Sequence, residues 1–123
     1  MLLEPNVMVF YVDDIAKSSQ FYQTLLGATP AEASPTFHSF KLSTGMHLAL
    51  KQKNTVIPTC DHKNGGSELA FILDDNKKVD ELFTEWLRRE INIILKPSIL
   101  PFGYSFVATD PDGNRLRVVS LGK

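Results

Sequence analysis

Residues 7–14 read Val-Met-Val-Phe-Tyr-Val-Asp-Asp, and residues 68–75 repeat the pattern as Glu-Leu-Ala-Phe-Ile-Leu-Asp-Asp. Each stretch is an apolar, strand-like run that ends in Asp-Asp and precedes an amphipathic helical segment. The repeat continues, because residues 45–50 (Gly-Met-His-Leu-Ala-Leu) correspond to residues 113–118 (Gly-Asn-Arg-Leu-Arg-Val). A chain built from two copies of one unit brings equivalent positions together, so the junction of the copies is the expected site.

The first copy predicts a strand, a helix and a hairpin. A strand over 7–12 is followed by Asp13 or Asp14, either of which can cap a helix that ends at Gly27. The helix carries a single apolar stripe, and two strands at 36–42 and 46–51 form the hairpin. Phe37 and Phe40 have opposite parity on their strand, and which of them faces the site is left open.

The second copy predicts the same order. The strand over 68–73 precedes Asp74 or Asp75 as the cap, and apolar residues then recur with helical spacing through Trp86, which we expect in the core. A short strand over 93–95 is broken by Pro97 and by the proline at 101. Strands over 104–109 and 115–121 form the last hairpin.

The predicted class is therefore α+β, with two tandem βαβββ units forming curved sheets around a cavity. We expect one domain over 1–123, with unit one at 1–51, a linker at 52–66 and unit two at 67–123. Cys60 and His62 fall in the linker, where solvated loop residues are expected rather than metal ligands.

Composition limits the function. Apolar residues make up 43% of the sequence. The net charge of -1 provides no excess of positive charge for binding nucleic acid or an anionic membrane. No apolar run approaches the roughly 18 to 20 residues that span a bilayer, and the first residues do not resemble a signal peptide. The single cysteine, Cys60, excludes an internal disulfide. We expect a cytoplasmic protein whose partner is a small organic ligand.

The doubled unit, the strand-Asp-Asp-helix openings and residues 110–116 (Asp-Pro-Asp-Gly-Asn-Arg-Leu) resemble the vicinal oxygen chelate superfamily. This superfamily contains glyoxalase I, extradiol dioxygenases and the fosfomycin- and bleomycin-resistance proteins. The resemblance covers nearly the whole chain. It implies a half-open barrel around a cavity, often completed by the partner chain of a homodimer. It does not by itself assign a reaction.

The enzymes of this superfamily hold a divalent metal with His, Glu or Gln from the opening and last strands of each unit. The resemblance transfers these four positions to Val7, Ala49, Glu68 and Arg117. Valine and alanine cannot coordinate, a guanidinium stays protonated, and one carboxylate does not make a transition-metal site. We therefore expect no metal and no other cofactor, as in the bleomycin-resistance branch.

Strand alternation predicts which residues line the cavity. The alternate positions are uniformly apolar and should pack on the helices. The expected ligand-binding residues combine apolar, aromatic and ionisable side chains: Val7, Val9, Tyr11, His47, Ala49, Glu68, Phe102, Tyr104 and Arg117.

Two roles stay open at this point. Glu68 and Arg117 should meet as a bidentate pair, either as a salt bridge in place of the metal or in contact with a ligand. His47 is either a proton donor or acceptor in the site, or a partly exposed scaffold residue. Tyr11, Phe102 and Tyr104 are suited to stack on a flat ligand.

The sequence thus predicts a metal-free protein that binds a small organic molecule, with an aromatic compound as the candidate ligand. One alternative is a metal-dependent lyase or dioxygenase of the glyoxalase or extradiol type. The other is a metal-free acid–base enzyme that uses Glu68 or His47, with Arg117 steadying an anion. No catalytic residue is predicted.

Overall fold

The computed structural model describes residues 6–57 and 67–121, and the chain divides into two compact units between Asn64 and Gly65. Cys60 and His62 lie outside the described residues. No helix in the described part of the chain is long and apolar enough to cross a membrane.

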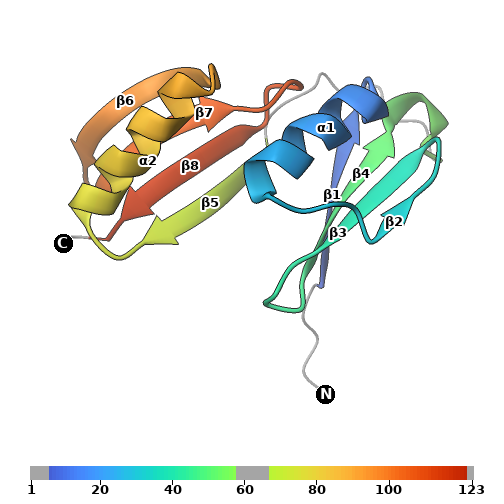
Figure 1. The fold of residues 1–123 in the computed structure, drawn as a ribbon, viewed down its shortest axis with the longest axis horizontal. Helices are drawn as coiled ribbons and strands as arrows, with labels where there is room; N and C mark the ends of the chain where they lie inside the picture. Colours follow the sequence, from blue (N-terminus) through green and yellow to red (C-terminus); the bar gives the residue numbers. More distant parts are fainter. Residues whose placement is uncertain (1–5, 58–66, 122–123) are drawn as a thin grey trace. The chain divides into compact units, whose positions relative to one another are not determined.

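Unit one is a four-stranded sheet with one long helix (Figure 1). The sheet order is β1-β4-β3-β2, with β1 parallel to β4 and the remaining neighbours antiparallel. A single 3-10 turn, η1, follows the sheet. The elements are β1 (Val7–Val12), α1 (Ile15–Leu26), β2 (Glu32–Ala33), β3 (Phe37–Lys41), β4 (His47–Gln52) and η1 (Lys53–Thr55).

Unit two repeats this arrangement in the order β5-β8-β7-β6, with β5 parallel to β8. The elements are β5 (Glu68–Leu73), α2 (Asn76–Arg88), β6 (Asn92–Leu100), β7 (Gly103–Thr109) and β8 (Arg115–Ser120). The two sheets and two helices confirm the predicted α+β class and the tandem βαβββ units.

The Asp-Asp pairs cap the helices, as expected. Asp14 accepts a hydrogen bond from the backbone N–H of Lys17 at 3.1 Å, and Asp75 accepts one from that of Lys78 at 2.9 Å. Helix α1 ends at Gly27, which adopts the left-handed conformation with φ 65°. The repeated carboxylates therefore start helices and are not a catalytic pair.

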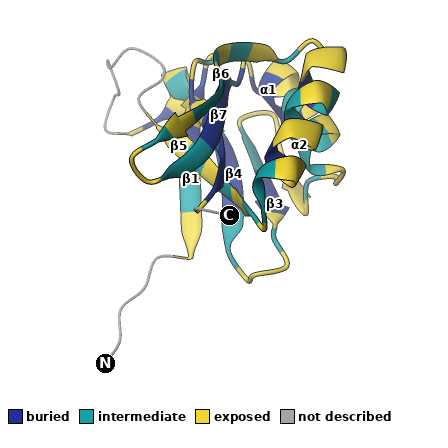
Figure 2. Cartoon of the chain, turned by 90° about the vertical axis from the view of Figure 1, so that its left-hand side faces the viewer, coloured by how far each residue is buried: buried dark blue, intermediate teal, exposed yellow. Residues whose placement is uncertain are grey.

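Each helix packs on one face of its own sheet. In unit one, Phe10 of β1 meets the buried ring of Tyr22 of α1, and Phe40 is fully buried. In unit two, Trp86 of α2 is 3% exposed and packs edge-on against Phe106 of β7. In Figure 2 strands β4 and β7 are therefore largely dark blue, whereas the outer surface of α2 is yellow.

Two predicted boundaries are wrong. The linker expected at 52–66 begins later, because Gln52 completes β4 and residues Lys53–Thr55 form η1. The short strand expected at 93–95 is the nine-residue β6, which continues through Pro97. Proline is tolerated there because β6 is the edge strand and its pairing with β7 shifts register twice, between Ile93 and Leu95 and between Leu95 and Ser98.

Candidate functional site

Each sheet has a second face, turned away from the helix of its own unit, which we call the helix-free face. Strand alternation places Val7, Val9 and Tyr11 on the helix-free face of unit one, since Phe10 and Val12 face the helix. The register pairs Val7 with His47 and Val9 with Ala49, so these residues share that face. Five of the nine predicted residues are thus brought together within unit one.

The helix-free face of unit one is apolar at β1 and polar toward β3. Val7, Val9 and Tyr11 are between 42% and 45% exposed, whereas Ala49 is fully buried. His47 is half-buried, and its Nδ1 lies 3.3 Å from the hydroxyl of Ser39. Phe37 pairs with Lys51 in register, so it is Phe37, and not the helix-facing Phe40, that shares this face.

In unit two, Arg117 contacts Glu68 across the helix-free face. The Nε of Arg117 donates to Oε2 of Glu68 at 3.2 Å, and the two side chains are 18% and 41% exposed. The predicted contact is present, but it is not bidentate. The second contact of the guanidinium is Nη1 to the hydroxyl of Ser105, at 3.4 Å.

Ser105 is a site residue that the sequence reasoning missed. It is fully buried on β7, and its hydroxyl donates to the carbonyl of Val118 at 2.9 Å while accepting from Arg117. The hydroxyl also lies 3.3 Å from the carbonyl oxygen of Phe106, so its proton faces backbone carbonyls and its lone pairs accept from the guanidinium. Its signal in the sequence is a small polar residue that precedes the apolar run 106–108 and lies on the same side of the strand as Val107, which pairs with Arg117.

Phe102 lies at the turn between β6 and β7, where its half-exposed ring is 5.2 Å from the guanidinium carbon of Arg117. The neighbouring Gly103 has φ 153° and presses against β8. A Cβ at this position would lie 2.2 Å from the backbone oxygen of Ser120. Glycine thus permits the close approach that holds Phe102 beside Arg117.

Tyr104 lies on the helix-covered face of the sheet and not with the other predicted residues. It has the parity of Phe106, and its hydroxyl donates to Asp80 of α2 at 2.6 Å. This hydrogen bond, followed by desolvation and the charge of Asp80, raises the pKa of Tyr104 above its usual value. The ring therefore anchors α2 instead of facing a ligand on the helix-free face.

The residues at the superfamily's metal positions do not fit a divalent cation. Val7 and Ala49 offer no donor atom, and the one carboxylate, Glu68, accepts from a guanidinium at the fourth position. Within residues 6–57 and 67–121, no three His, Cys, Asp or Glu side chains gather as a ligand set.

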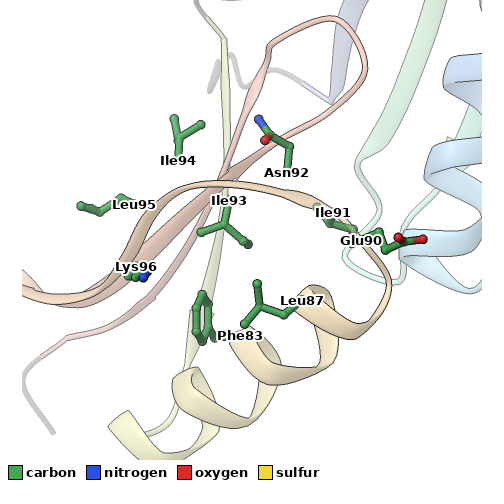
Figure 3. Close-up of a pocket in the computed structure, with 9 residues that line it drawn as sticks. All are labelled: Phe83, Leu87, Glu90, Ile91, Asn92, Ile93, Ile94, Leu95 and Lys96. Carbon is green, nitrogen blue, oxygen red and sulfur yellow. The ribbon is translucent and has the colours of Figure 1, made fainter.

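A separate hollow of about 750 Å³ lies between the end of α2 and strand β6. Figure 3 shows Phe83 and Leu87 rising from the helix toward Ile93 of the strand. Its other lining residues are Glu90, Ile91, Asn92, Ile94, Leu95 and Lys96. None of the predicted site residues lines this hollow, so it is distinct from the predicted residues on the helix-free faces.

Comparison with known families gives one match over most of the chain. The profile described as "Glyoxalase/Bleomycin resistance protein/Dioxygenase superfamily" matches residues 5–118.

Individual relatives agree with that match. The chain is 29% identical to the phenazine antibiotic resistance protein EhpR of Enterobacter agglomerans, covering 97% of this chain and 93% of the relative. It is 33% identical to the metallothiol transferase FosB of Staphylococcus haemolyticus, and the match covers 92% of this chain and 80% of the relative. The solution structure of ATC0852 from Agrobacterium tumefaciens is 40% identical, with a TM-score of 0.86 and coverage of 99% and 100%.

Proposed function

Because this chain belongs to the glyoxalase/bleomycin resistance protein/dioxygenase superfamily, we propose that it binds a small organic ligand without a metal ion. One observation carries the proposal. At the position where a metal ligand would stand, Arg117 bridges Glu68, Ser105 and the ring of Phe102. A fixed cation repels a metal but supports an organic ligand.

The proposed ligand is flat and aromatic. Phe102 is 50% exposed beside Arg117, so part of its ring is accessible for contact with an aromatic ligand. Tyr11 gives unit one an accessible ring of its own. The name of EhpR, a phenazine resistance protein, supports this ligand class. Homodimeric assembly, which the family resemblance implies, belongs to the same proposal.

A metal-dependent enzyme is the second candidate, since the chain is 33% identical to a metallothiol transferase. It would need ligands beyond Glu68, and its activity would be lost with the metal. Acid–base chemistry without a metal would rely on the half-exposed carboxylate of Glu68 or on His47. The metal-dependent candidate is the weaker of the two, because three of the four expected metal positions, Val7, Ala49 and Arg117, offer no metal-binding atom.

Phenazine is the probe for the proposed function. Isothermal titration should give saturable binding of phenazine to the wild-type protein. Phe102→Ala should weaken this binding about 2- to 12-fold, because an aromatic stacking contact contributes roughly 0.5–1.5 kcal/mol.

The matched control is Leu87→Ala. Leu87 is 51% exposed, like Phe102, but it lies on α2, which covers the other face of the sheet. Its truncation should leave the affinity unchanged. An equal loss in both variants, or no saturable binding by the wild type, would contradict the proposed site.

A further inference from the structure

The helix-free face of unit two carries an excess of positive charge. Glu68 on β5 lies directly opposite Arg115 on β8 in the register, and Arg117 lies two residues further along the same face. Two guanidinium groups thus accompany one carboxylate. This imbalance favours an anionic ligand over a neutral or cationic one.

The guanidinium of Arg117 has hydrogen-bonding capacity to spare. Its Nε donates to Glu68 and one Nη1 hydrogen to Ser105, while Nη2 donates to no acceptor among the described residues. Three of its five N–H groups are therefore available, and the Nη1–Nη2 edge matches the two oxygens of a carboxylate. The Ser105 contact and the nearby Phe102 ring hold this edge in place.

We propose that the ligand is a flat aromatic acid, whose oxyanion binds the Nη edge of Arg117 while its ring stacks on Phe102. This inference rests on the proposed function and names the ligand class of the same site. The two contacts lie close together, because the Phe102 ring is 5.2 Å from the guanidinium carbon. A carboxylate attached directly to the aromatic ring fits this spacing.

Glu68 competes with the ligand for Arg117. Its carboxylate is 41% exposed and makes a single contact with the guanidinium, so solvent already stabilises much of its charge. Its negative charge also repels an incoming carboxylate. Removing that charge should strengthen binding of an acid and leave binding of the neutral analogue unchanged.

Unit one has the same charge balance on its own helix-free face. The register places Lys41 opposite His47, and Lys51 opposite both Tyr11 and Phe37. The carboxylate on this face is Glu32 of the edge strand β2, which pairs with Ser39. Lysines therefore outnumber carboxylates among the described residues of this face as well.

The test compares phenazine-1-carboxylate with phenazine-1-carboxamide, which have the same shape but differ in charge. In a titration at pH 7.5, the wild-type protein should bind the carboxylate about 10-fold more tightly than the carboxamide, as expected for a charge-assisted hydrogen bond. Glu68→Gln should raise the carboxylate affinity a further few-fold without changing that of the amide. Glu81→Gln, which removes an exposed carboxylate from α2, is the control and should change neither.

Equal affinities for the acid and the amide would overturn the anion preference and leave the proposed binding function standing. Binding of neither compound would overturn both. An unchanged carboxylate affinity in Glu68→Gln would show that the acid binds away from the Glu68–Arg117 pair, and this too would overturn the inference.

Discussion

Replacing Arg117 with methionine is expected to weaken binding of phenazine-1-carboxylate about 10-fold, the lower end of the roughly 1.5–3 kcal/mol that hydrogen bonds to a charged group contribute. Methionine retains an apolar chain beside Phe102, so the neutral phenazine-1-carboxamide should lose little affinity. The two ligands should then bind equally. Isothermal titration of both compounds measures the change.

Arg117→Lys is the informative control, since it keeps the charge but not the planar pair of donors. It should give an intermediate affinity for the acid. The Met variant should remain folded, because Glu68 is 41% exposed and can be solvated without its partner. A Met variant that still prefers the acid would exclude Arg117 as the anion contact.

Truncating Phe106 to alanine should destabilise unit two by about 3–5 kcal/mol, the usual cost of removing a buried aromatic side chain. The ring is fully buried on β7 and packs against Phe83 and Trp86 of α2, with both centroid distances 5.4 Å. Urea denaturation followed by circular dichroism measures the change. Trp86 fluorescence reports the same unit, because it is the chain's single tryptophan.

Phe102→Ala is the matched truncation outside the core. Its ring is half exposed, so its loss should reduce the free energy of unfolding by less than about 1 kcal/mol. Truncation of Phe106 should therefore lower the free energy of unfolding, whereas truncation of Phe102 should mainly lower the affinity for the ligand. Similar destabilisation by both truncations would contradict the assignment of Phe106 to the core and Phe102 to the ligand site.

Much of the fold was predictable because local signals in the sequence agree with the tertiary structure. The Asp-Asp pairs cap both helices, Gly27 ends α1, and Trp86 is buried, as expected. Strand parity also placed Glu68 and Arg117 on one face, and the contact between them is present. These features depend on short-range geometry, which spacing reveals.

Other features depend on strand neighbours that the sequence does not reveal. Pro97 suggested a break, but the edge position of β6 tolerates it. Tyr104 was assigned by its aromatic character, whereas its parity with Phe106 directs it toward Asp80. Ser105 was missed because its role comes from lying beside Arg117 on the neighbouring strand.

The central claim is that this protein binds an aromatic ligand without a metal ion. The most direct test is titration of chelator-treated protein with phenazine-1-carboxylate, followed by the same titration after adding Zn²⁺ or Mn²⁺. Because Arg117 stands at a metal-ligand position, the affinity should be the same with and without the metal. Binding that appears only when the metal is restored would contradict the account.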